Sequence, residues 1–196
     1  MVSLMRLLAY NSVATITLEV KRSKFICFIM PISEFETQMQ RLKLEHPKAR
    51  HFVYAWRRLN EYSQIVEQSS DDGEPKGTSG RPTLAVLQGE DLIDTAIITV
   101  RYFGGIKLGT GGLVRAYGEA VNIVIDSVEL KEYVKKVKLD VKVEYSRFEK
   151  FKHTLSGFDS EIIEQDFLTD CVNVTLEIDE ALKEQFIEQS EPLFYT

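Results

Sequence analysis

The stretch from Thr95 to Ser127 has the sequence TAIITVRYFGGIKLGTGGLVRAYGEAVNIVIDS. Its first part, Thr95–Phe103, is an unbroken run rich in β-branched and aromatic residues, which predicts a buried strand. Gly104–Gly112 contains five glycines and predicts a loop. Leu113–Ser127 carries apolar residues at helical spacing and predicts a helix. The stretch therefore places a glycine-rich loop directly before a helix N-terminus.

The residues before this stretch predict a mixed arrangement of strands and helices. Ser33-Glu34-Phe35-Glu36 matches a capping box, so we expect a helix from Phe35 that stops before Pro47. Ser69–Gly80 has no large apolar residue and predicts a long polar loop. The other expected elements are strands at Thr15–Val20, Lys24–Ile32, His51–Arg57 and Tyr62–Glu67, and a helix at Arg81–Leu87.

The pattern changes after Glu129. Apolar and charged residues alternate from Val137 to Tyr145, which predicts a half-buried strand. A second capping box, Ser146-Arg147-Phe148-Glu149, predicts a helix that ends near Gly157. Further strands are expected at Ile162–Leu168 and Val172–Ile178, a helix capped by Asp179 at Glu180–Gln189, and a closing strand at Leu193–Tyr195. This βαββαβ order predicts a ferredoxin-like domain over residues 129–196, which follows an α+β domain over residues 1–128. The boundary is expected near Ser127–Tyr133.

The charge of the chain is divided unevenly between these two parts. The 196 residues carry 24 Lys and Arg against 30 Asp and Glu, a net charge of −6. Residues 129–196 hold 9 basic and 16 acidic residues, a net of −7, which leaves 15 against 14 and a net of +1 for residues 1–128. Phosphate binding requires basic surface, so the charge disfavours nucleic acid for the second part only.

Other features of the composition indicate the class of protein. No apolar run approaches the roughly 18 residues of a membrane span, and Arg6 interrupts the apolar start of the chain, so we expect neither a membrane partner nor a signal peptide. Cys27 and Cys171 show no metal or redox spacing and are expected to be reduced thiols. These features favour a cytoplasmic protein.

The glycine-rich loop is a candidate anion site. Glycine backbone amides can approach a ligand closely, and a helix N-terminus favours negative charge. The loop has neither the Walker A nor the dinucleotide-binding spacing, and a tight turn in which glycines only relieve strain would give the same pattern. The residues we expect to bind phosphate here are Arg101, Lys107, Gly109, Thr110, Gly111, Gly112 and Arg115.

The polar loop at Ser69–Arg81 is a second candidate. Its carboxylates, Asp71, Asp72 and Glu74, are hard oxygen ligands of the kind that Mg²⁺ binds. Its donors, Lys76, Thr78, Ser79 and Arg81, suit a phosphate. A polar surface loop held by aspartate turns explains the same residues without any ligand, and no known metal-loop spacing is present.

His51 and Tyr54 lie on an expected strand among other aromatic residues. A single histidine in such a strand is most often packed in the core, although a neighbouring Asp71 or Asp72 would make a pair of general base and orienting group. Aromatic residues near the arginines can stack bases, or they can form core. No serine, cysteine or threonine lies in a known catalytic motif.

Two segments go beyond general patterns. Asp71–Pro82, DDGEPKGTSGRP, resembles the DDGEPxGTAGxP signature of the IMPACT/YigZ family, and Val100–Tyr117 resembles its VRYFGGxxLGTGGLVRAY signature almost position for position. Ser23–Ile26 and His51–Ala55 match weaker elements in the same order. Ser79 departs from the family's alanine, which leaves open whether this position is packed or faces a ligand.

The resemblance implies a fold and a field of function. It implies an N-terminal domain like the second domain of a small-subunit ribosomal protein and a C-terminal domain like the fifth domain of elongation factor G. Eukaryotic members regulate translation, by competing for the activator of an initiation-factor kinase. Bacterial members have no settled biochemical activity, and nucleic-acid or ribosome binding is the usual inference from their fold.

Two hypotheses follow. The first is a binding protein of translation or stress response, without catalysis or cofactor, that holds RNA or the ribosome through the N-terminal loops. Its acidic C-terminal domain would face a basic protein surface. The second is a Mg²⁺-dependent enzyme or small-molecule binder that uses the same loops for a phosphorylated ligand, with Asp71, Asp72 and Glu74 on the metal.

Overall fold

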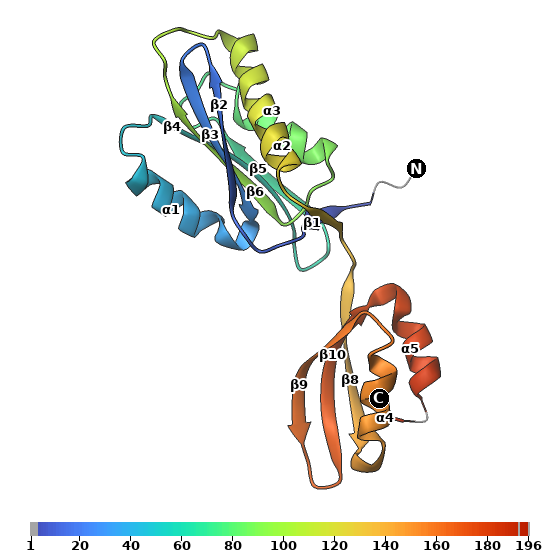
Figure 1. Cartoon of the computed structure of the whole chain (residues 1–196). Coiled ribbons are helices and arrows are strands. Elements are labelled where there is room, and N and C mark those ends of the chain that lie inside the picture. The colour runs from blue at the N-terminus through green and yellow to red at the C-terminus, as the bar shows by residue number, and fades with distance from the viewer. Residues whose placement is uncertain (1–3, 192, 196) are drawn as a thin grey trace. The chain divides into compact units, whose positions relative to one another are not determined.

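The first part of the chain is built around an antiparallel sheet of five strands in the order β2-β3-β6-β4-β5 (Figure 1). The computed structural model describes residues 4–191 and 193–195, and it divides the chain into two units between Tyr133 and Val134. The chain is an α+β protein. The strands of the first sheet are β2 (Ala14–Val20), β3 (Ser23–Pro31), β4 (His51–Leu59), β5 (Ile65–Ser70) and β6 (Thr95–Tyr102).

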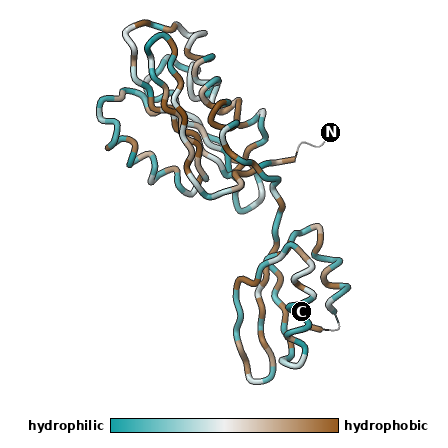
Figure 2. Tube along the Cα trace, viewed as in Figure 1, coloured by the Kyte–Doolittle hydropathy of each residue, from teal (hydrophilic) through white to brown (hydrophobic). Residues whose placement is uncertain are grey.

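The central strand is β6, the strand predicted from the unbroken apolar run. It pairs with β3 on one side and β4 on the other, and all its residues except Tyr102 are buried. Helices cover both faces of the sheet, so the side chains of a central strand are shielded from solvent on both faces. Figure 2 shows how hydrophobic residues concentrate along these inner strands.

The two faces of the sheet carry different helices. One face packs against α1 (Phe35–Glu45), with Phe35, Met39 and Leu42 in the core as the spacing predicts. The other packs against α2 (Gly80–Gly89) and α3 (Thr110–Asp126), where Tyr117 is fully buried. A short ribbon of β1 (Arg6–Leu8) and β7 (Leu130–Glu132) completes the first unit.

The second unit has its own sheet, in the order β8-β10-β9, with a separate hydrophobic core. Tyr195 bridges Lys142 of β8, so the expected last strand is present only as an isolated bridge at the far edge. The order along the chain is therefore that of the βαββαβ domain. The elements are β8 (Lys136–Glu144), α4 (Tyr145–Leu155), β9 (Ser160–Phe167), β10 (Cys171–Asp179) and α5 (Lys183–Ser190).

Both predicted capping boxes are wrong, for different reasons. The chain enters α1 through a short 3-10 helix, η1 (Ile32–Glu34), so Glu34 is the residue before the helix and no side chain caps it. Helix α4 begins at Tyr145, which places Ser146 inside the first turn, where its hydroxyl contacts the Glu144 carboxylate. The predicted cap by Asp179 is confirmed, because its carboxylate accepts from the Ala181 amide at 2.8 Å at the start of η2 (Glu180–Leu182).

Several boundaries also differ from the predictions. Helix α3 begins at Thr110 rather than Leu113, so its first turn contains Gly111 and Gly112. The weak strand expected at Tyr62–Glu67 is β5 at Ile65–Ser70, because Asn60 accepts from the amides of Tyr62 and Gln64 and closes a turn there. No helix in the described ranges is long and apolar enough to cross a bilayer.

Candidate anion-binding site

Both signature loops leave the same end of the five-stranded sheet. Lys24 near the start of β3 pairs with Tyr102 at the end of β6, and His51 at the start of β4 pairs with Arg101. Ser70 at the end of β5 lies opposite Tyr54 of β4. The strand register therefore brings the polar loop after β5 and the glycine loop after β6 together.

A pocket of about 360 Å³ lies where the loops meet. The polar loop contributes Glu74 and Pro75, and β6, the glycine loop and α3 contribute the rest of the lining: Arg101, Phe103, Lys107, Leu108, Gly109, Thr110 and Leu113. The wall combines apolar side chains with a helix N-terminus and two basic residues. Such a pocket suits a ligand that has both an anionic and an apolar part.

Asp71 holds the polar loop in shape. Its carboxylate accepts hydrogen bonds from the amides of Gly77, Ser79 and Gly80 and from the Ser79 hydroxyl, at 2.7–3.0 Å. Partial burial acts to raise the pKa of Asp71, but these hydrogen bonds outweigh it and the pKa is lowered. Ser79 is fully buried, so the residue that departs from the family pattern packs inside the loop and donates to Asp71.

Asp72 ties the loop to the sheet. Its carboxylate accepts from the Phe52 amide at 2.6 Å, and its backbone carbonyl lies 2.8 Å from His51 Nδ1. His51 is thus beside Asp72, as the base-and-orienter hypothesis required, but it contacts the carbonyl rather than the carboxylate. A backbone carbonyl as acceptor places the His51 proton on Nδ1.

Glu74 lies at the centre of a buried polar cluster behind the pocket. One oxygen of its carboxylate accepts from Arg101 Nη1 at 2.5 Å and from the Tyr117 hydroxyl at 2.8 Å. The side chains of Arg101 and Glu74 are only 6% and 3% exposed. Burial and the nearby Glu74 charge raise the pKa of Tyr117, so this phenol is a neutral donor.

Arg101 is enclosed by aromatic rings as well. Its guanidinium carbon lies 5.3 Å from the Phe25 ring centre and 5.8 Å from that of Phe103, and Nη2 donates to Ser23 Oγ at 3.4 Å. Arg101 Nε is buried and has no hydrogen-bond partner in the described part of the chain. The charge of Arg101 is therefore balanced by Glu74, while its Nε donor is left unsatisfied.

The three carboxylates of the polar loop do not form a metal site. Asp71 binds loop amides, Asp72 binds the start of β4, and Glu74 binds Arg101 and Tyr117. Within the described residues no group of three or more His, Cys, Asp or Glu side chains is placed to hold a metal ion. The residues present therefore do not fit the Mg²⁺ centre of the enzyme hypothesis.

The glycine loop presents the start of α3 to the pocket. Gly109 adopts φ +71° directly before Thr110, its carbonyl accepts from the Leu113 amide, and no side chain caps the helix. Arg115 lies over this first turn, with Nη1 4.0 Å from the position of a Cβ on Gly111. The arrangement has the free amides and the positive end of a helix dipole that favour an anion.

The other expected site residues lie outside the pocket lining. Lys76 and Arg81 are exposed. Thr78 is buried and donates to the Pro75 carbonyl at 2.7 Å, so it supports the loop. Tyr54 packs on the α1 face against Phe35, and its hydroxyl accepts from Gln68.

The sequence predicts that Lys21-Arg22-Ser23 joins the strands β2 and β3, but it gives no sign that this turn contacts the glycine loop. Ser23 Oγ accepts from Arg101 and from the Gly104 amide at 3.2 Å. A Cβ on Gly104 would lie 2.0–2.3 Å from backbone atoms of Arg22 and Ser23, so glycine is required there. The one signal in the sequence is that Ser23 begins a family element, which gives no sign of its contact with Gly104.

Comparison with known proteins assigns the chain to a family. The model of the Impact N-terminal domain matches residues 21–125. An IMPACT family member of Haemophilus influenzae is 34% identical over 171 residues, which cover 86% of this chain and 82% of the relative. The IMPACT family member YigZ of Escherichia coli is 35% identical over 156 residues, which cover 78% of this chain and 76% of the relative. A crystal structure of a hypothetical protein matches 97% of this chain and 95% of its own at 29% identity and a TM-score of 0.66. The two signature loops around the pocket and these matches together show that the chain belongs to the IMPACT family.

Proposed function

We propose that the chain is a cytoplasmic binding protein of translation or stress response that holds single-stranded RNA in the pocket between the two loops. The observation that carries the proposal is the meeting of three features in one pocket: the N-terminus of α3, the Lys107 side chain and the exposed ring of Phe103. The link to translation rests on the family resemblance.

The phosphate of the ligand would lie at the start of α3. This helix has 17 residues, so its dipole is well developed, and Lys107 and Arg115 are exposed beside its first turn.

A base of the ligand would stack on Phe103. This ring is 55% exposed, although it lines a pocket and follows directly on the central strand. Aromatic rings beside cations form the stacking platforms of single-strand binding proteins, where each base is held without regard to sequence. Leu108 and Leu113 add apolar surface next to the ring.

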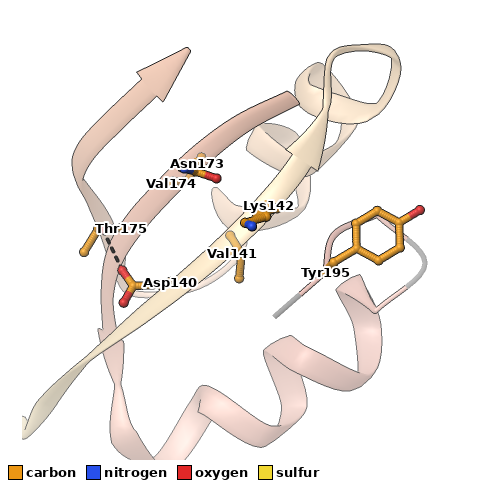
Figure 3. Close-up of a pocket in the computed structure, with 7 residues that line it drawn as sticks. All are labelled: Asp140, Val141, Lys142, Asn173, Val174, Thr175 and Tyr195. Atoms are coloured by element: carbon orange, nitrogen blue, oxygen red, sulfur yellow. Dashed lines mark hydrogen bonds between the residues drawn. The ribbon is translucent and has the colours of Figure 1, made fainter. Parts of the chain in front are cut away.

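The acidic second unit would take a different partner, a basic protein surface. Its helices cover one face of the sheet, and the other face carries polar residues that alternate with the core, as Figure 3 shows for Asp140, Lys142, Asn173 and Thr175. Lys138 is paired in register with Glu177 on this face, whereas Glu164 and Asp166 lie on the edge strand β9. Phosphate would be repelled at this edge, and a basic segment would be attracted.

Fluorescence anisotropy with a labelled single-stranded RNA of about a dozen nucleotides tests the proposal. We expect binding that weakens with salt, and the double variant Lys107→Ala/Arg115→Ala should reduce the slope of log affinity against log salt by about 1.4, or about 0.7 for each phosphate contact. The matched control, Lys43→Ala/Arg58→Ala, removes the same charge from α1 and from the far end of β4 and should leave the slope unchanged.

The stacking part has its own test. Phe103→Ala should weaken RNA binding by about 1–3 kcal/mol, whereas Phe103→Trp should retain it. An absence of RNA binding at low salt, or equal loss in the Lys43/Arg58 control, would contradict the proposal.

A further inference from the structure

The turn between β2 and β3 has an unusual composition for its geometry. Val20 pairs with Ser23, so Lys21 and Arg22 form a two-residue turn, and their φ angles are +46° and +66°. Turns with positive φ at both positions strongly favour asparagine, aspartate and glycine. A lysine and an arginine here adopt a backbone conformation that residues with a Cβ disfavour.

This turn is fixed to the glycine loop of the pocket. The Gly104 backbone packs so closely on Arg22 and Ser23 that no side chain fits between them, and the Gly104 amide donates to Ser23 Oγ. Ser23 Oγ also accepts a hydrogen bond from Arg101, which lines the pocket. The turn and the pocket therefore move as one piece.

The two cations of the turn have no side-chain partner among the residues that the structure describes. Lys21 and Arg22 are both exposed, and within the described residues neither forms an ion pair or a side-chain hydrogen bond. A turn of this kind gains nothing in stability from them, because asparagine, aspartate and glycine fit its backbone better. Their positive charge is therefore the property that distinguishes them from better turn formers.

We infer that the Lys21–Arg22 turn is a second phosphate contact beside the pocket, so that the ligand is a polynucleotide strand rather than a mononucleotide. The inference rests on the proposed function, because it extends the same site along the strand. One phosphate would lie at the start of α3, a base on Phe103, and a further phosphate at the turn. A phosphodiester backbone places negative charges at regular spacing, which suits cations fixed on two neighbouring loops.

The experiment replaces the turn by one that fits its geometry. In the variant Lys21→Asn/Arg22→Gly we expect the Tm to rise, because the new residues adopt positive φ without strain. Its affinity for the single-stranded RNA should fall several-fold, with a salt slope smaller by about 1.4. Its affinity for adenosine monophosphate, which reaches the pocket alone, should equal that of the wild type.

A second variant separates charge from backbone effects. Lys21→Gln/Arg22→Gln removes the charge without improving the turn, so it should lose the same RNA affinity with no rise in Tm. The Lys43→Ala/Arg58→Ala control should bind RNA and the mononucleotide as the wild type does.

The outcomes distinguish this inference from the proposed function. If both turn variants keep the RNA affinity and salt slope of the wild type while Lys107→Ala/Arg115→Ala loses RNA affinity, the inference is overturned. The pocket then remains the RNA site. Equal loss of mononucleotide and RNA binding in the turn variants would also overturn it. If the turn variants lose binding to an acidic peptide but not to RNA, the turn contacts a protein instead of RNA, which also overturns the inference. If the wild type binds no RNA, the proposed function itself fails.

Discussion

Glu74 is the residue on which the pocket wall depends, because one of its carboxylate oxygens holds two other side chains. Arg101 comes from the central strand and Tyr117 from α3, so this oxygen joins the sheet, a helix and the polar loop. Removing one partner of a buried ion pair leaves the other charge without compensation. The carboxylate thus acts on the stability of the protein and on the position of the pocket lining together.

Substitution of Glu74 should therefore be costly. Glu74→Gln leaves the buried Arg101 guanidinium unpaired and should lower the free energy of unfolding in urea by about 3–5 kcal/mol. The matched control is Glu45→Gln, which breaks the exposed pair with Arg41 and should lower it by less than about 1 kcal/mol. A similar small effect in both variants would mean that the Glu74–Arg101 pair contributes little.

Asp71 should make the stability of the loop depend on pH. Its pKa is lower in the folded protein than in the unfolded chain, where it is about 3.9, so its contribution is complete above that value and is lost as the pH falls through the folded pKa. We expect Asp71→Asn to have a lower Tm than the wild type at neutral pH. The difference should shrink below about pH 4, and a constant difference across a pH series of thermal melts would contradict this role.

At the scale of elements, the contact between the β2–β3 turn and the glycine loop positions the site. Gly104→Ala places a methyl group within 2.3 Å of the backbone of Arg22 and Ser23, so one of the two segments must shift. We expect a large loss of Tm together with weaker RNA binding. Gly118→Ala is the control, because this mid-helix position of α3 has nothing within 4 Å, and it should stabilise the protein by about 0.5–1 kcal/mol.

The elements that could be predicted from the sequence are those with a regular apolar pattern. The central strand β6 has an unbroken apolar run because both of its faces are covered. Helix α1 and strand β8 each bury one face, so their apolar residues recur at regular spacing. The capping boxes failed because the chain enters α1 through a short 3-10 helix, and because α4 begins two residues before the first helical position that a cap at Ser146 implies. No local pattern separates these cases from a true capping box.

The site could be predicted only as a pair of loops. The glycine loop was identified as a helix start with cations, and the structure places that start in a pocket. The roles of Ser23 and Glu74 could not be predicted, because each depends on residues that the fold brings together from distant parts of the chain. The role of Asp71 is local, and it agrees with the alternative of a polar loop held by aspartate turns. A carboxylate that accepts hydrogen bonds from backbone amides cannot be distinguished in the sequence from one that binds a metal ion.

At the scale of the whole molecule, the two units have separate cores and different net charges, because residues 134–196 are acidic and residues 1–133 are neutral. The core of the second unit is formed by its own strands, α4 and α5. Leu130 of β7 lies opposite Leu8 of β1, and the Tyr133 amide donates to the Met5 carbonyl, so the residues after Val128 pair with the first unit. The division in the structure therefore lies after Tyr133, at the C-terminal end of the expected boundary region and after residue 128, where the first domain was expected to end.

This division predicts how fragments of the chain behave. A fragment of residues 1–133 should fold cooperatively and show the same salt-dependent RNA binding that is proposed for the full chain. A fragment of residues 1–128 lacks β7, exposes Leu8 of the core, and should have a lower Tm. Residues 134–196 lie within the size range of domains that fold alone, about 55–65 residues, and should fold without binding RNA. Thermal melts and anisotropy on the three fragments check this, and RNA binding by residues 134–196 would show that the acidic unit, rather than the pocket, holds the strand.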